Sequence, residues 1–143
     1  MNYTQLATEL LNKMQALRRA KPHKHMSEAL QGEAFVLQYI AQHGKDVLPG
    51  EISAEMDVSS ARIAAALNKL ESKGLITRQI DLTDRRKILV SITQDGEALA
   101  AKHQETVTKE AAKMLELLGE EDAKEYIRIT GKLAEKLPKN VDF

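Results

Sequence analysis

Seven basic side chains fall within 26 residues in the middle of the chain. Only Glu71, Asp81 and Asp84 accompany them, so this segment has a net charge of +4 although the whole chain, with 21 basic and 21 acidic residues, is neutral. A neutral protein with one basic segment can turn that segment toward a polyanion. The alternative is a solvated charged surface without a ligand. The basic residues are Arg62, Lys69, Lys73, Arg78, Arg85, Arg86 and Lys87.

Most catalytic patterns are missing from the sequence. The absence of cysteine excludes disulfides, thiol nucleophiles and thiol redox sensing. There is no Gly-rich phosphate loop, no nucleophile-elbow serine, no His-Glu-x-x-His and no Rossmann fingerprint. Asp84 lacks the paired carboxylate that acid–base work needs. We therefore expect a binding protein, not an enzyme, and no cofactor.

Composition narrows the class of protein further. Aromatic residues make up 3% of the chain and tryptophan is absent, which weighs against a single-strand binder that stacks bases. No apolar run reaches the ~18–20 residues of a membrane span. The first residues also lack the basic-then-apolar pattern of a signal peptide. We expect a cytoplasmic protein.

The histidines raise a metal hypothesis. His23 and His25 are two residues apart in a connector, and zinc accepts histidine and carboxylate ligands. A solvated linker is the interpretation we favour, so no metal ligand is assigned, and a zinc-responsive protein stays open as an alternative. The other candidate ligands, which lie elsewhere in the sequence, are His43, His103, Glu28, Glu33 and Glu105.

Apolar periodicity predicts a mostly helical chain with one β-hairpin. Spacings of three and four residues predict helices over 4–19, 28–43, 50–56, 60–73, 94–118 and 120–137, with 22–27 as a connector. The period then changes to two over 76–80 and 88–93, which predicts two strands joined by a polar loop. Ser59 or Ser60 is the expected N-cap of helix 60–73, and Thr93 that of helix 94–118.

This order of elements predicts a winged helix-turn-helix. Two short helices joined by a tight turn are followed by a hairpin whose loop, the wing, ends in basic residues. The major groove of B-DNA admits one helix, and a basic loop beside that helix can reach the neighbouring backbone or minor groove. Winged helices also serve as protein-interaction modules, so a module without DNA binding remains an alternative.

Residues 50–96 resemble the MarR family of bacterial transcriptional regulators. The resemblance starts with Ile52-Ser53-Ala54-Glu55-Met56-Asp57-Val58-Ser59 and Leu67-Asn68-Lys69-Leu70-Glu71-Ser72-Lys73-Gly74-Leu75-Ile76. It continues with Asp84-Arg85-Arg86 and Val90-Ser91-Ile92-Thr93-Gln94-Asp95-Gly96. The Asp-Arg-Arg wing and the helix start after it are the most specific part. The flanking helices match as well, so the resemblance extends over nearly the whole chain.

The resemblance implies a mostly α fold with a small β-hairpin wing, a winged helix-turn-helix flanked by dimerisation helices. Residues 1–27 would form the N-terminal dimerisation helix and connector, 28–96 the DNA-binding region and 97–143 the C-terminal dimerisation helices. A homodimer would then bind a palindromic double-stranded operator, usually repress transcription, and release the DNA when an effector binds. Helices 4–19, 94–118 and 120–137 would make the dimer interface.

Family positions imply which residues contact DNA. Helix 60–73 would be the recognition helix; in the wing, Asp84 would orient Arg86, which would enter the minor groove. The helix is rich in alanine, which can touch a thymine methyl but offers no hydrogen bond. Specificity should therefore rest on Arg62, Ser60 and Asn68, together with DNA shape. The full candidate set is Ser59, Ser60, Ala61, Arg62, Ala64, Ala65, Asn68, Lys69, Asp84, Arg85, Arg86 and Lys87.

The turn departs from the family pattern at one residue, and the methionines allow two interpretations. Asp57 stands where the family commonly has glycine in the turn, but aspartate tolerates the left-handed region. Met14, Met26, Met56 and Met114, with Leu11, Leu17 and Phe35, are expected in the core, although methionines also line adaptable apolar pockets. Such a pocket would take an apolar or phenolic effector, with Tyr3, Tyr39 or Tyr126 as hydrogen-bond donors.

Overall fold

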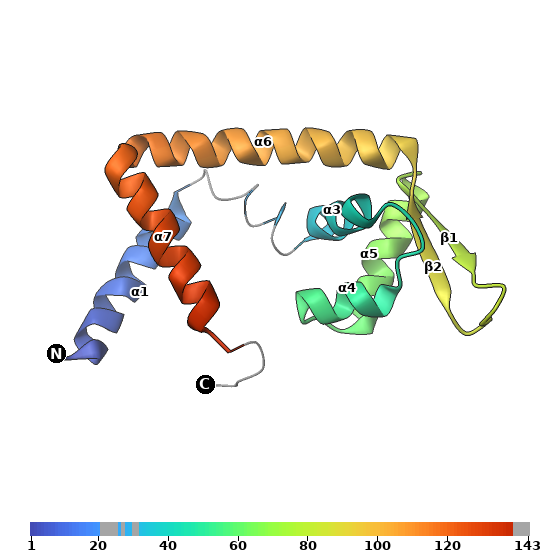
Figure 1. The fold of residues 1–143 in the computed structure, drawn as a ribbon, viewed down its shortest axis with the longest axis horizontal. Coiled ribbons are helices and arrows are strands. Elements are labelled where there is room, and N and C mark those ends of the chain that lie inside the picture. Colours follow the sequence, from blue (N-terminus) through green and yellow to red (C-terminus); the bar gives the residue numbers. More distant parts are fainter. Residues whose placement is uncertain (21–25, 27, 30–31, 139–143) are drawn as a thin grey trace. The chain divides into compact units, whose positions relative to one another are not determined.

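The structure of the chain is a computed structural model that describes residues 1–20, 26, 28–29 and 32–138 (Figure 1). The chain forms two compact units, Met1–Val107 and Thr108–Phe143. The elements follow one another as α1 (Tyr3–Arg19), α3 (Glu33–His43), α4 (Pro49–Met56), α5 (Ser60–Ser72), β1 (Ile76–Ile80), β2 (Ile88–Ile92), α6 (Gln94–Leu118) and α7 (Glu120–Lys136).

The predicted helix over 28–43 has the wrong start. Gly32 has extended backbone, with φ −101° and ψ −165°, and forms the N-cap of α3, so that helix begins at Glu33. Glu28 and Ala29 are helical before this interruption, as is Met26, which the sequence placed in the connector. Apolar spacing continues through the break, and so it could not reveal the break. Residues 21–25, 27 and 30–31 lie outside the described residues. The other predicted elements are confirmed to within a residue.

The hairpin is antiparallel and is joined to the helical part by a separate bridge. Its register pairs Ile76 with Ile92 and Ile80 with Ile88. Val47, in the segment before α4, exchanges two backbone hydrogen bonds with Val90 of β2, at 2.9 and 2.8 Å. Val90 is fully buried there. The base of the hairpin is therefore fixed to the helices, whereas its far end extends from them (Figure 1).

One hydrophobic core joins α3, α4, α5, the hairpin and the start of α6. Ten of its side chains are nearly or fully buried: Val36, Leu37, Ile40, Val47, Ile52, Ile63, Leu67, Leu70, Ile76 and Val90. The first turn of α6 is locked onto this core. Thr93 caps it as predicted, because its Oγ1 accepts a hydrogen bond from the Gly96 N–H at 3.0 Å. The same hydroxyl donates to the Gly74 carbonyl at 2.7 Å.

Helix α1 has an apolar stripe that the described part of the chain leaves exposed; it consists of Leu6, Leu10, Met14 and Leu17. Asn2 caps the helix by accepting hydrogen bonds from Thr4 and Gln5, and the helix ends at Arg18 and Arg19. Every residue of α1 is exposed. The expectation of a core position is therefore wrong for Leu11, Met14 and Leu17, which are 62%, 55% and 44% exposed. Their spacing identified an apolar face correctly, but spacing does not say what covers it.

Helix α7 likewise buries none of its residues. It begins after Gly119, has three acidic residues in its first turn and Lys136 in its last, and so complements the helix dipole at both ends. Its exposed apolar side chains are Tyr126, Ile127, Ile129 and Leu133, all between 48% and 58% exposed.

Candidate nucleic-acid interface

The turn between α4 and α5 is built by local hydrogen bonds. Asp57 adopts the left-handed conformation, with φ 53° and ψ 49°, and its backbone N–H donates to the Ser53 carbonyl. The Ser53 hydroxyl donates to the Val58 carbonyl at 2.6 Å. The turn thus forms with aspartate in the place of glycine, as expected from the tolerance of aspartate for this region.

Helix α5 starts at the position that the sequence indicated. Ser59 is its N-cap, with extended backbone, and its Oγ accepts a hydrogen bond from the Arg62 N–H at 3.3 Å. The cap satisfies one of the amide groups that a helix start leaves without a partner. The hydroxyl of Ser59 is therefore engaged in holding the helix end, directly beside Ser60 and Arg62.

One side of α5 is buried in the core and the opposite side is exposed. Ile63, Leu67 and Leu70 are buried in the core. The helical repeat places a second row of residues on the opposite side, and all four of these are exposed. We call this row the outer stripe; it consists of Ala61, Ala65, Asn68 and Ser72. Arg62 and Lys69 lie along one flank of the stripe, and Ser60 and Ala64 along the other, and all of them are exposed too.

The wing loop is held in shape by its own hydrogen bonds. The Asp81 N–H donates to the Lys87 carbonyl and the Lys87 N–H to the Asp84 carbonyl, both at 3.0 Å. The Asp81 carboxylate accepts from the Thr83 N–H at 2.9 Å. This backbone hydrogen bond lowers the pKa of Asp81, and the charge of Lys87 lowers it further. These hydrogen bonds join the two ends of the loop and define its turn.

Asp84 and Arg86 form a pair at the wing. The Asp84 Oδ1 accepts from the Arg86 backbone N–H at 3.1 Å and from its Nε at 3.2 Å. The Arg86 side chain is 92% exposed, whereas that of Asp84 is 31% exposed. The carboxylate thus holds one edge of the guanidinium and leaves the rest of it in solvent. Arg85 and Lys87 are exposed on either side.

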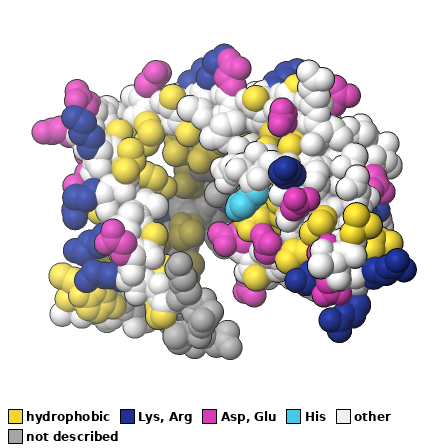
Figure 2. Space-filling view, turned by 45° about the vertical axis from the view of Figure 1, so that its right-hand side comes forward, with side chains coloured by type: hydrophobic (Ala, Val, Ile, Leu, Met, Phe, Trp, Pro, Cys, Tyr) yellow, Lys and Arg dark blue, Asp and Glu magenta, His cyan; other side chains and the backbone are white. Residues whose placement is uncertain are grey.

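Sequence reasoning missed the contacts of Arg78 and the exposure of Leu82. In the sequence Arg78 is only one basic residue of a strand, but in the structure its guanidinium bridges two residues of α5, Asn68 and Glu71. No spacing rule connects a strand to a helix in this way. Leu82 is an apolar residue in the wing loop and is 96% exposed. In Figure 2, Lys and Arg side chains gather where the hairpin end of the molecule comes forward, with hydrophobic side chains among them.

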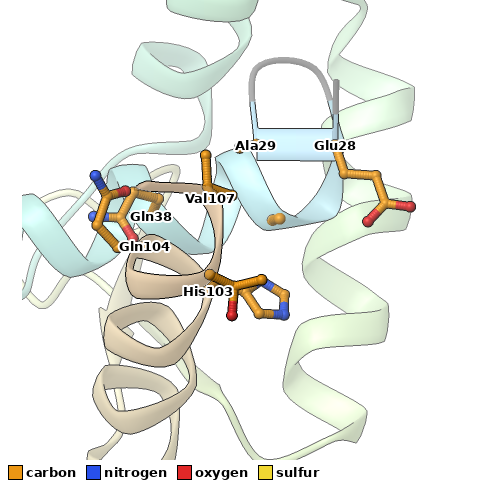
Figure 3. A pocket seen from close by; sticks show the side chains of 8 residues that line it. Glu28, Ala29, Gln38, His103, Gln104 and Val107 are labelled. Atoms are coloured by element: carbon orange, nitrogen blue, oxygen red, sulfur yellow. The ribbon is translucent and has the colours of Figure 1, made fainter. Parts of the chain in front are cut away.

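A cavity lies beside the C-terminal end of α5. Its volume is about 470 Å³, and its apolar walls come from Leu37, Leu70, Leu75 and Leu99. Its polar groups include His103 and the ion pair between Lys73 Nζ and Glu33 Oε1, at 2.8 Å. A smaller hollow adjoins it, shares Glu28 and His103, and is lined mainly by apolar surface (Figure 3). The C-terminal end of α5 thus forms part of the cavity wall.

Within the described residues no three histidine or carboxylate side chains are grouped so that they could hold a metal ion. His43 instead stacks on Tyr39, with ring centroids 4.2 Å apart, and its Nδ1 lies 2.7 Å from the Tyr39 carbonyl oxygen. His23 and His25 are outside the described residues. None of the described helices is both long enough and apolar enough to cross a membrane.

Comparisons with known proteins agree on one family. Residues 30–87 match the family model described as MarR family. The transcriptional repressor MdtR of Bacillus subtilis is 32% identical over 139 residues, which are 92% of this chain and 87% of that protein. The crystal structure of YusO, also from Bacillus subtilis, matches with a TM-score of 0.69 at 27% identity. The match covers 96% of this chain and all of the YusO chain. The repressor CouR, solved with a 23-mer DNA duplex, has a TM-score of 0.69 at 20% identity, over 94% of this chain and 98% of its own.

Proposed function

The chain belongs to the MarR family of transcriptional regulators, and from that premise we propose that it binds a palindromic operator as a homodimer and leaves it when an effector binds. The observation that carries the proposal is the outer stripe of α5. It lies opposite the core side of the helix, all four of its residues are exposed, and Arg62 and Lys69 lie along its flank. A helix whose exposed side carries small residues and flanking cations can enter a major groove closely while its charges meet phosphates.

The wing supplies a second contact in this proposal. Arg86 is almost fully exposed and is oriented by Asp84 at 3.2 Å, so its guanidinium enters the minor groove beside the site of α5. Arg85 and Lys87 contact the backbone phosphates. An interaction module without DNA binding would need an apolar groove beside α5, whereas small, polar and charged residues occupy the exposed side of that helix. The remaining candidate contacts are Ser59, Ser60, Ala61, Ala64, Ala65, Asn68 and Lys69.

The dimer of the proposal uses α1, α6 and α7. The apolar stripe of α1 and the apolar side chains of α7 are exposed in the single chain. Such patches on a protein are typical of interaction surfaces. Residues 1–27 and 97–143 would then form the dimerisation part and residues 28–96 the DNA-binding part. A dimer of this kind presents two recognition helices to half-sites about 10 bp apart.

The effector site of the proposal is the cavity behind α5. Its volume of about 470 Å³ falls within the range of small-molecule sites, ~300–1,000 Å³. Leucine walls with Lys73 and His103 suit an apolar or phenolic molecule with an acidic group. Such a molecule would compete with Glu33 for Lys73 and so change the packing at the end of α5. If the molecule binds the DNA-free conformation of the protein more tightly than the DNA-bound one, its binding releases the operator.

Fluorescence anisotropy tests the proposal directly. The labelled duplex comes from the region upstream of the protein's own gene, and a random duplex of equal length is the control. We expect nanomolar, sequence-selective binding that weakens steeply between two salt concentrations, because Lys and Arg on phosphates release counterions. Equal affinity for both duplexes at low salt contradicts sequence-specific binding. Small phenols and benzoates, titrated into the complex, should lower the anisotropy if the cavity is the effector site.

A further inference from the structure

Arg78 of β1 holds two residues of the recognition helix at once. Its Nη2 donates to the Asn68 Oδ1 at 2.8 Å and to the Glu71 Oε1 at 2.9 Å, and its Nε donates to the Glu71 Oε2 at 3.2 Å. The contact with Glu71 is thus bidentate, which is the strong form of this ion pair. The Arg78 side chain is only 26% exposed, so the guanidinium is partly enclosed between the strand and the helix.

The chemistry of the guanidinium determines which way the amide of Asn68 points. A guanidinium has donors and no acceptor, so only the oxygen of Asn68 can face it. The amide nitrogen, with its two N–H groups, must then lie on the other side of the side chain. Asn68 belongs to the outer stripe and is exposed, so this nitrogen is presented on the surface that we assign to DNA.

We propose that Arg78 is a positioning residue that fixes Asn68 as a hydrogen-bond donor toward DNA. This inference rests on the proposed DNA binding and assigns a specificity to one position of that interface. An asparagine that recognises adenine must both donate to N7 and accept from N6. Because Arg78 holds the oxygen, Asn68 is directed instead to a pure acceptor, such as the N7 and O6 edge of guanine or a phosphate oxygen.

The guanidinium of Arg78 has a second effect on the same surface. Glu71 is an exposed carboxylate on the recognition helix, next to the flank that carries Ala64, and alone it would repel the phosphates. The bidentate contact with Arg78 neutralises it and holds it against the strand. Arg78 therefore needs no contact with the DNA itself to favour binding, and its replacement disturbs the direction of Asn68 and the charge of Glu71 together.

A double-mutant cycle separates positioning from the other roles that Arg78 could have. The variants are Asn68→Ala, Arg78→Lys and the combination of the two. Lysine keeps the positive charge and loses the planar fork, so the charge near the DNA is unchanged. Affinities are measured on a duplex selected from a random-sequence library by the wild-type protein, and on duplexes that replace each of its base pairs in turn.

The expected result is strong coupling between the two positions. Asn68→Ala should weaken binding roughly 10-fold on the selected duplex, the loss of a well-formed hydrogen bond. Arg78→Lys should weaken it by a similar factor. The loss in the double variant should be clearly smaller than the product of the two single losses, and should exceed that of Asn68→Ala only by the repulsion of the released Glu71 carboxylate. If the acceptor is a base, both single variants should also lose discrimination at the same base pair. If the acceptor is a phosphate, neither variant should lose discrimination at any base pair. Additive losses, or wild-type affinity for Asn68→Ala, would overturn the inference.

Two measurements keep the outcomes distinct. Arg128→Lys is the matched control, because Arg128 forms a similar bidentate contact with Glu125 on the side of α7 away from its apolar side chains. We expect it to leave the affinity and the dimer unchanged. The NMR signals of the Asn68 side-chain amide, observed without DNA, should indicate a rigid group in the wild type and a mobile one in Arg78→Lys. Equal mobility in the two overturns the positioning role even if the DNA binds, whereas absence of selective binding by the wild type overturns the proposed function.

Discussion

Arg62 is the residue at which base recognition and phosphate binding are most easily told apart. It lies on the flank of the outer stripe in the first turn of α5, and its backbone N–H is held by the Ser59 cap. If it reads a base edge, Arg62→Ala should cost about 1–3 kcal/mol of binding free energy and relax the preference at one base pair. The measurement is the affinity for the selected duplex and for its single base-pair variants.

The control for this prediction is Lys124→Ala, which removes one exposed cation that pairs with Glu120 on the side of α7 away from its apolar side chains. This control should bind like the wild type. If Arg62→Ala weakens binding equally on all duplexes and flattens the salt dependence, the residue contacts a phosphate and reads no base.

Asp84 should matter through Arg86. Arg86→Ala should weaken operator binding without changing the dimer, because the exposed guanidinium makes the wing contact. Asp84→Ala should weaken binding as well, since it removes the acceptor at 3.2 Å that orients the side chain. In the Arg86→Ala background the second substitution should add nothing. Fluorescence anisotropy measures the affinities, and sedimentation measures the oligomeric state. Wild-type affinity of Arg86→Ala would refute the wing contact.

Glu71 of α5 should make the stability of the protein depend on pH. The hydrogen bond from Arg78 lowers its pKa below the usual value of 4.5. A carboxyl group whose pKa is lower in the folded protein adds stability above its unfolded pKa and loses that contribution as the pH falls through the folded value. Compared with Glu71→Gln, the wild type should therefore be more stable at pH 7, and the difference should vanish in acid below the ordinary glutamate range. Urea unfolding at several pH values measures it, and a constant difference would be contrary to expectation.

At the scale of elements, Gly96 joins α6 to the hairpin. A Cβ built at Gly96 would lie 2.1 Å from the Leu75 carbonyl oxygen and 2.9 Å from the Ile92 Cδ1. The backbone oxygen cannot move aside without disturbing the start of β1. Gly96→Ala should therefore lower the free energy of unfolding by about 1–3 kcal/mol, the usual cost of overpacking. Thermal and urea unfolding measure the change.

Gly50 is the matched control for this substitution. It lies in the first turn of α4, and a Cβ there would meet nothing within 4 Å. Alanine is favoured over glycine in a helix, so Gly50→Ala should leave the stability unchanged or raise it slightly. A Gly96→Ala protein as stable as Gly50→Ala would mean that α6 can shift freely against the hairpin.

At the scale of the whole molecule, the apolar stripe of α1 predicts a dimer. Leu10 is 59% exposed in the stripe. A 17-residue helix without buried contacts is marginal in water, so a partner should stabilise it. Leu10→Glu should dissociate the dimer and weaken operator binding, because one recognition helix then binds one half-site. Asn12→Glu, on the opposite side of α1, should do neither. Sedimentation equilibrium and anisotropy test both; a Leu10→Glu protein that stays dimeric places the interface elsewhere.

Local patterns in the sequence determined most of the fold and part of the site. Helix periods, the Ser59 and Thr93 caps and the change to a two-residue period located the elements, because these signals arise from neighbours along the chain. The family motifs placed Asp84 beside Arg86, a contact between residues only two apart. The start of α3 escapes such patterns because apolar spacing runs through Gly32 without a change.

The tertiary structure alone decided which residues meet across elements and which faces are covered. Arg78 meets Asn68 and Glu71 because the strand passes beside α5, a proximity that depends on how the hairpin packs on the core. The core position predicted for the stripe of α1 is wrong because apolar periodicity reports a face and not the partner that covers it. Local rules act over a few residues, whereas packing joins distant segments, and the specificity that we propose for α5 depends on packing.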